Sequence, residues 1–147
     1  MVDAYRLHAG ILHLDEAKFL VSLLAKVAKS DGRVGELEAR LISQVLDDLS
    51  RKVSGVIGVR EYLKEVYNSQ KENVDNAYET ARNYKRAFNL NYDTCVARLT
   101  FFLNLAYIDG EFNASEQAVI RNIAYGFGID KDTLDEIILK FDSFYGS

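Results

Sequence analysis

Residues 28–38 read AKSDGRVGELE, and residues 106–116 read AYIDGEFNASE. Both follow the pattern Ala-x-x-Asp-Gly-x-apolar-x-x-x-Glu, and every matched position is 78 residues from its partner. The surrounding apolar residues keep this offset in the pairs Leu24 and Phe102, Val27 and Leu105, Ile42 and Ile120, and Val45 and Ile123. An internal duplication determines the architecture of a chain more strongly than any other pattern. The two segments therefore predict two similar helix–turn–helix units that face each other across a core.

The composition indicates one helical domain. The chain has 147 residues, of which 48% are hydrophobic, and this is enough to bury a core. Proline, which breaks helices, is absent. Apolar residues recur at helical spacing along most of the chain, which predicts an all-α fold of about seven helices. We expect a lead-in at residues 1–14 and a single domain at residues 15–147.

The spacing also predicts where the helices lie. The first helix is expected from about residue 15 to the turn at 30–32, and the next four at residues 36–49, 59–70, 72–88 and 92–108. The sixth is expected from the second Asp-Gly turn to about residue 125, and Asp130 caps the seventh. The longest loop is expected at residues 50–58. The helix at 72–88 is the more polar one and is expected on the outside, whereas the helix at 92–108 and its repeat partner near the N-terminus should be central.

The charge pattern argues against a nucleic-acid partner. The formal net charge is −4, whereas binding to phosphate backbones needs a clustered excess of lysine and arginine. Arg82, Lys85 and Arg86 form a cluster too small to change this conclusion. We interpret that cluster as one solvated helix face.

The single cysteine and the absence of targeting patterns indicate a cytoplasmic protein. Cys95 stands in an apolar-rich run and is interpreted as a small buried hydrophobe. A chain that cannot form an internal disulfide fits a reducing environment. No signal peptide is recognisable, and no apolar stretch approaches the ~20 residues that span a bilayer. The chain is expected to be soluble and not to insert into a membrane.

Four carboxylates stand at equivalent points of the duplication: Asp31, Glu38, Asp109 and Glu116. In a structural interpretation, each aspartate ends a helix, and each glutamate lies near the third position of the next one, where it favours free N–H groups and the helix dipole. In a second interpretation, the four converge on a divalent cation such as calcium, manganese or zinc, because clustered carboxylates repel one another without one. In a third, they form a polar docking patch for another protein.

A standard EF-hand is excluded in both segments. With the glycine at loop position six, the first and third positions are Val27 and Lys29 in one copy and Leu105 and Tyr107 in the other, and none supplies a carboxylate. A metal site would therefore need both copies. Such a site could support metal-assisted hydrolysis, but no residue stands out as a nucleophile, so the chain is not expected to be an enzyme and requires no cofactor.

The same two segments resemble a known family. Residues 24–34 with Glu38, and residues 103–112 with Glu116, resemble the TerB-like helical domain of tellurite-resistance TerB proteins. The resemblance covers about residues 15–145 and is strongest to the TerB-like region of DjlA-type, DnaJ-like co-chaperones. It implies about seven helices in a pseudo-two-fold repeat. For TerB proteins it also implies a metal-binding acidic site, which corresponds to Asp31, Glu38, Asp109 and Glu116 here.

For the DnaJ-like proteins the resemblance implies an upstream membrane anchor and a downstream J domain that stimulates a DnaK-type chaperone. This chain has no membrane segment, and without proline it cannot hold the His-Pro-Asp motif of a J domain. We expect a non-enzymatic interaction or regulatory domain of such a co-chaperone, with a protein partner or self-association. In a larger anchored protein it would lie at the cytoplasmic face of the inner membrane. The alternative is a stand-alone, metal-binding stress protein related to tellurite resistance.

Overall fold

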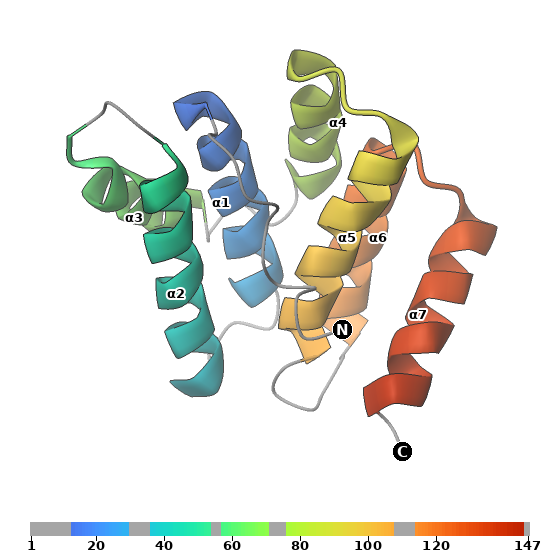
Figure 1. Cartoon of the computed structure of the whole chain (residues 1–147). Helices are drawn as coiled ribbons and strands as arrows, with labels where there is room; N and C mark the ends of the chain where they lie inside the picture. The colour runs from blue at the N-terminus through green and yellow to red at the C-terminus, as the bar shows by residue number, and fades with distance from the viewer. Residues whose placement is uncertain (1–12, 30–35, 54–56, 71–75, 108–113, 146–147) are drawn as a thin grey trace.

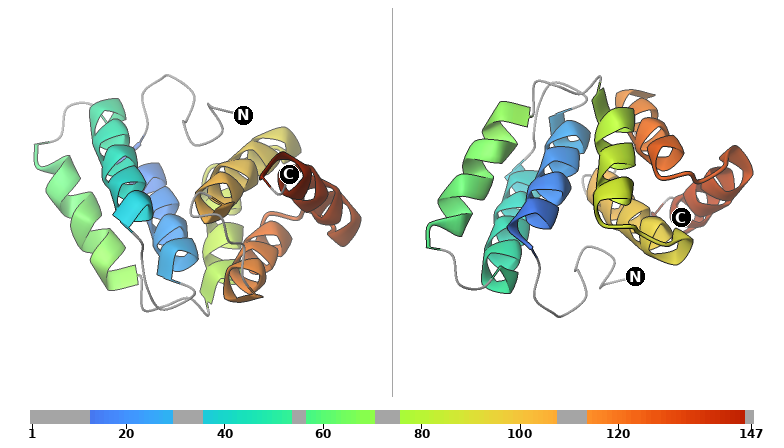
Figure 2. Two further views of the ribbon diagram at one scale, coloured as in Figure 1. Left: turned by 90° about the horizontal axis from the view of Figure 1, so that it is seen from below. Right: turned by 90° about the horizontal axis from the view of Figure 1, so that it is seen from above.

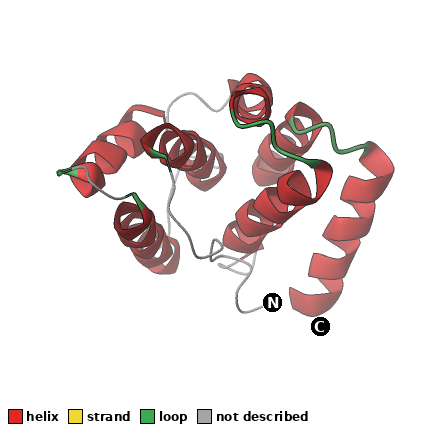
Figure 3. Ribbon diagram, turned by 45° about the horizontal axis from the view of Figure 1, so that its top comes forward, coloured by secondary structure: helices red, strands yellow, loops and turns green. Residues whose placement is uncertain are grey.

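The computed structural model describes residues 13–29, 36–53, 57–70, 76–107 and 114–145. These residues form seven α-helices and no strand (Figure 3), which confirms the all-α prediction. The helices are α1 (Leu14–Lys29), α2 (Glu36–Lys52), α3 (Val59–Gln70), α4 (Ala77–Ala87), α5 (Tyr92–Tyr107), α6 (Ala114–Gly126) and α7 (Lys131–Tyr145). Most of the expected lead-in lies outside the described residues.

The boundaries of the helices repeat the 78-residue offset seen in the sequence. α1 and α5 have 16 residues each, and both their first and last residues are 78 positions apart. The next helices, α2 and α6, begin at Glu36 and Ala114 with the same separation. All eight apolar residues paired by this offset are buried. The offset does not extend to α3 and α7, which begin at Val59 and Lys131.

Two helices form the centre of the bundle, as predicted. α1 contacts α2, α3, α4, α5 and α6, and α5 contacts α1, α6 and α7. In Figures 1 and 2, α2 and α3 lie on one side of α1, and α4 to α7 lie on the other. Every residue from Phe101 to Tyr107 at the end of α5 is buried. This end of α5 is therefore buried on every side, and Asn104 is its one polar residue.

The polar fourth helix, α4, exposes Glu79, Arg82 and Arg86 to solvent, as predicted, but its other face is packed. α4 packs against both α1 and α6, and Tyr84 at its centre is 0% exposed. The small residues Ala77 and Ala81 are also fully buried and allow the neighbouring helices to approach. A Cβ on Gly126 of α6 would lie 2.4 Å from the backbone oxygen of Tyr78. Small residues and close backbone contact therefore hold the packed face of α4 against its neighbours.

Two predicted boundaries can be compared directly. α2 continues to Lys52, past the expected end at residue 49, because Ser50 donates a hydrogen bond to the Leu46 carbonyl and Lys52 pairs with Asp48 one turn earlier. The predicted cap of the last helix is confirmed. The Thr133 backbone N–H donates to Oδ1 of Asp130 at 2.8 Å. Hydrogen bonding from the Thr133 side chain, and then from its backbone N–H, lowers the pKa of the Asp130 carboxyl.

Candidate functional site

The structure describes only part of the predicted carboxylate site. Asp31 and Asp109 lie outside the described residues, and Glu38 lies in α2 but its side chain is not described. Glu116 is 2% exposed. Glu38 and Glu116 are the third residues of their helices, as predicted. Among the described side chains no cluster of His, Cys, Asp and Glu suits a metal ion, so convergence of the four carboxylates stays a prediction.

The helices around the two Asp-Gly segments share one end of the bundle. In Figure 1 the last turns of α1 and α5 and the first turns of α2 and α6 all lie at the bottom. α1 contacts α2, α5 and α6, and α5 contacts α6. This arrangement brings the flanks of the two segments to the same side of the core, which the duplication predicts.

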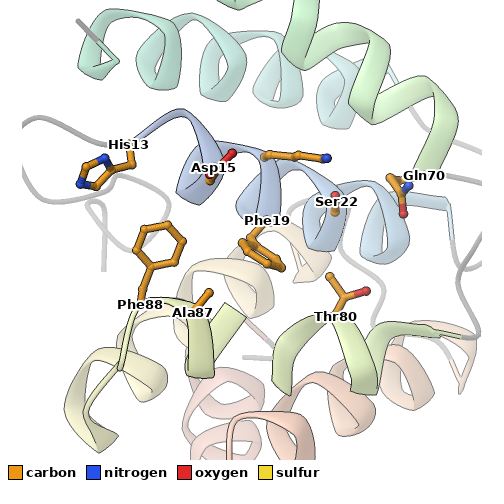
Figure 4. A pocket seen from close by; sticks show the side chains of 9 residues that line it. His13, Asp15, Phe19, Ser22, Gln70, Thr80, Ala87 and Phe88 are labelled. Atoms are coloured by element: carbon orange, nitrogen blue, oxygen red, sulfur yellow. The ribbon is translucent and has the colours of Figure 1, made fainter. Parts of the chain in front are cut away.

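A hollow of about 630 Å³ lies where α1, α3 and α4 meet (Figure 4). Phe19 of α1 and Phe88, just beyond α4, lie next to each other along it. His13 lies at one end, and Gln70 and Thr80 lie at the other. Its lining combines aromatic faces with hydroxyl, amide, imidazole, carboxylate and ammonium groups. Concave sites with such mixed lining are the usual places for ligands and peptide side chains.

The aromatic wall of the hollow is backed by a packed ring cluster. Phe19 stacks on Tyr84 with the ring centroids 5.4 Å apart, and Phe88 meets both rings edge-on at 6.2 and 5.8 Å. His13 is 6.1 Å from Phe88. Aromatic pairs in such geometries are held by their quadrupoles as well as by burial. The wall is therefore formed before any ligand binds.

The Tyr84 hydroxyl anchors this wall to two other helices. It donates a hydrogen bond to Oε2 of Glu16 at 2.6 Å and accepts one from Nε of Arg98 at 3.1 Å. Nη2 of Arg98 is 3.7 Å from the same Glu16 oxygen. Burial, and then the Glu16 hydrogen bond, raise the pKa of Tyr84, against the opposing effect of Arg98. The phenol thus remains protonated and joins α1, α4 and α5.

A buried lysine is hydrogen-bonded to one residue that lines the hollow. Asp15, Ser22 and Lys26 are spaced at i, i+7 and i+11 along one face of α1, and the first two line the cavity. Lys26 is 0% exposed, and its Nζ donates to Oε1 of Gln70, another lining residue, at 2.8 Å. Burial lowers the pKa of Lys26 to about 8. A buried cation whose hydrogen-bond partner is a neutral amide lining a cavity is a candidate functional group.

Sequence reasoning missed this lysine. In the sequence, Lys26 only interrupts an apolar stretch. Its position in the helix could have indicated that it is buried, because its two neighbours and the residues one turn before it are predicted to be buried. Residues 20–28 of α1 are buried on every side of the helix, so a lysine among them is buried as well. Cys95, in contrast, is buried as predicted, and burial raises the pKa of its thiol against the opposing effects of Lys85 and Arg98.

The chain belongs to the family described as tellurite resistance protein TerB, whose sequence profile matches residues 17–138. It is also 25% identical over 120 residues to the co-chaperone protein DjlA of Yersinia pseudotuberculosis serotype I (strain IP32953), a match that covers 82% of this chain. DjlA of Yersinia pestis is 24% identical over the same length. These matches confirm the resemblance inferred from the two Asp-Gly segments. No solved structure matches the chain.

The matched region covers 42% of the length of each DjlA relative. The chain therefore corresponds to less than half of those proteins, and their co-chaperone activity belongs to the whole relatives. Across the ranges that the structure describes, no helix is both long enough and apolar enough to cross a membrane.

Proposed function

We propose that this chain is a protein-interaction domain related to the TerB-like region of DjlA co-chaperones, and that a partner segment binds in the hollow between α1, α3 and α4. The observation that carries the proposal is the preformed aromatic wall made by Phe19 and Phe88 beside a row of polar groups. Aromatic anchors surrounded by hydrogen-bonding groups are typical of binding hot spots.

The lining fits a binding role better than a catalytic one. Of its polar groups, Ser22 and Thr80 lie with Gln70 at one end of the hollow, whereas His13 lies at the other (Figure 4). A nucleophile needs a base within hydrogen-bond reach, and His13 lies at the far end of the hollow from both hydroxyls (Figure 4). A non-enzymatic role is therefore our proposal.

Site-specific photo-crosslinking in cells tests this proposal. A benzoylphenylalanine at Thr80 lies at the wall of the hollow, and the same group at Gln44, an exposed position on α2, serves as the control. We expect a discrete protein adduct from Thr80 that the Gln44 position does not give. The same adducts from both positions, or none from Thr80, would contradict the proposal.

The relation to co-chaperones has its own test. A chain without proline cannot present the His-Pro-Asp motif of a J domain, so it should not by itself stimulate the ATPase of a DnaK-type chaperone. A complete DnaJ-like protein serves as the positive control in the same assay. Stimulation by this chain alone would contradict its assignment as an interaction or regulatory domain.

A second candidate function is divalent-cation binding by Asp31, Glu38, Asp109 and Glu116. It is supported by the burial of Glu116 and by the shared end of the bundle at which the flanking helices meet. Calorimetry with calcium, manganese and zinc tests it, with the double change Glu38→Gln and Glu116→Gln expected to abolish any heat of binding. Absence of binding in the unmodified protein would refute it.

A further inference from the structure

A second hollow, of about 320 Å³, lies on the other side of α4, against α6 and the turn that follows it. Arg82, Lys85 and Arg86 border it from α4. Tyr78 of α4 and Tyr125 of α6 also border it and are 41% and 37% exposed. We name this surface, defined by these five residues, the basic face. It shares no lining residue with the hollow between α1, α3 and α4.

The cations of the basic face are not neutralised by the described part of the chain. Ion pairs among the described residues engage Arg51, Lys52, Arg60, Arg98 and Lys131, and none involves the three cations of this face. Asp130 comes two residues after Gly128, which borders the hollow, but its carboxylate accepts the Thr133 N–H. In a chain of net charge −4, three adjacent cations that make no ion pair with a described carboxylate form a locally positive surface.

Helix electrostatics explains only part of this arrangement. Lys85 and Arg86 stand in the last turn of α4, where positive charge stabilises the helix dipole. That effect decays within a turn, so it does not account for Arg82. It also gives no reason for two tyrosine side chains to remain partly exposed beside the cations.

The shape of the basic face is fixed by backbone contact. Gly126 leaves no room for a side chain, since a Cβ there would lie 2.8 Å from Cβ of Ala81 on α4. Gly128 has a φ of +78°, and a Cβ on it would lie 3.0 Å from Nζ of Lys85. α4 and α6 are therefore in close backbone contact, and the tyrosines and cations lie along this contact. A preformed surface loses little entropy when it binds.

We propose that the basic face binds a short acidic segment of a partner protein. Arginine and tyrosine are the side chains most enriched at protein interfaces, and unpaired cations in a concave surface attract carboxylates. A membrane is the less suitable occupant, because stable electrostatic anchoring takes clusters of about four to eight basic residues. A nucleic acid is disfavoured by the net charge of −4.

The test is an NMR titration with a capped decapeptide of alternating glutamate and glycine, at about 20 mM salt, where screening is weak. We expect saturable amide shifts centred on Tyr78, Tyr125 and Gly128. The double reversal Arg82→Glu with Arg86→Glu should weaken binding by at least about tenfold. The control reversal Lys64→Glu with Lys140→Glu changes the net charge equally at exposed sites of α3 and α7, and it should alter affinity less than about twofold.

Three results would overturn the proposal: no saturable shifts, shifts centred elsewhere, or equal weakening by both double reversals. In a parallel experiment, binding of the protein to vesicles of phosphatidylcholine with phosphatidylserine is measured. Vesicle binding that exceeds peptide binding and depends on Arg82 and Arg86 would assign the face to lipid instead. The Thr80 crosslink should persist in the Arg82→Glu, Arg86→Glu variant, so the two binding proposals succeed or fail separately.

Discussion

Nζ of Lys26 donates a hydrogen bond of 2.8 Å to Oε1 of Gln70, and this joins α1 to the last residue of α3 inside the protein. The amide supplies one acceptor but no negative charge. Lowering the pKa from 10.5 to about 8 corresponds to a penalty of about 3 kcal/mol for the charged form. The protein thus keeps a destabilising cation next to Gln70, which lines the hollow between α1, α3 and α4.

Lys26→Met should stabilise the protein at pH 7. The variant removes the charge penalty but leaves Gln70 Oε1 without its donor, which costs about 1–2 kcal/mol, so we expect a net gain of about 1–2 kcal/mol. Between pH 8 and 10.5 the unfolded chain holds a proton that folded Lys26 has released, so wild-type stability rises with pH. The gain should therefore disappear by about pH 10.

Urea denaturation at a series of pH values measures this effect. Lys18→Met is the matched control, because Lys18 is exposed on the same helix and its loss should change stability little at any pH. Destabilisation of Lys26→Met at pH 7 would show that the ammonium has a compensating charge, contrary to the account.

Tyr84→Phe should destabilise the protein by about 1–3 kcal/mol at neutral pH, because Glu16 and Arg98 lose a shared partner in a nearly dry site. The folded pKa of Tyr84 is raised, so its contribution is complete below the unfolded pKa of about 10 and declines above it. The difference between wild type and variant should therefore shrink at alkaline pH. Thermal unfolding at pH 7 and at pH 10.5 tests this, with Tyr92→Phe as an exposed control.

The alkaline decline should persist in part in Tyr84→Phe. Tyr107 donates its hydroxyl to Asp142, and its pKa is raised by burial and then by that hydrogen bond. A variant whose alkaline stability no longer declines at all would contradict the role given to Tyr107.

Gly126→Ala should destabilise the α4–α6 contact by about 1–3 kcal/mol, because the new methyl group would lie 2.4 Å from the Tyr78 carbonyl oxygen. Gly58→Ala is the comparison. Its Cβ would meet no atom within 4 Å, and only its φ of +78° opposes the change, at about 1 kcal/mol. Thermal unfolding of both variants measures the difference. A smaller loss for Gly126→Ala than for Gly58→Ala would mean that the helices separate easily.

The sequence was sufficient for the fold because helix identity depends on local periodicity. The duplication predicted the starts of α2 and α6 at Glu36 and Ala114, and the apolar pairs predicted the buried faces of α1 and α5. The sequence did not predict how closely α4 and α6 approach, because that contact depends on Gly126 of α6 lying against the Tyr78 carbonyl of α4. Such a contact joins residues far apart in the chain and leaves no periodic signal.

The site was predicted less well than the fold. Motif reasoning directed attention to repeated carboxylates, of which the structure describes only the Glu116 side chain. The hollow is assembled from three helices, so no single stretch of sequence reveals it. Arg82 and its neighbours were visible as a cluster, but the tyrosines from α4 and α6 that accompany them become adjacent only in the folded chain.

The central claim is that a partner binds in the hollow between α1, α3 and α4. The most direct test uses the partner protein identified by the Thr80 crosslink and measures how tightly it binds two tryptophan variants of this chain. Ala87→Trp obstructs the hollow from an exposed position on α4, and Ala118→Trp makes the same change on an exposed position of α6. If the partner binds in the hollow, Ala87→Trp should weaken binding at least about tenfold, and Ala118→Trp should match the wild type. Equal affinities for the two variants, measured by calorimetry, would contradict the account.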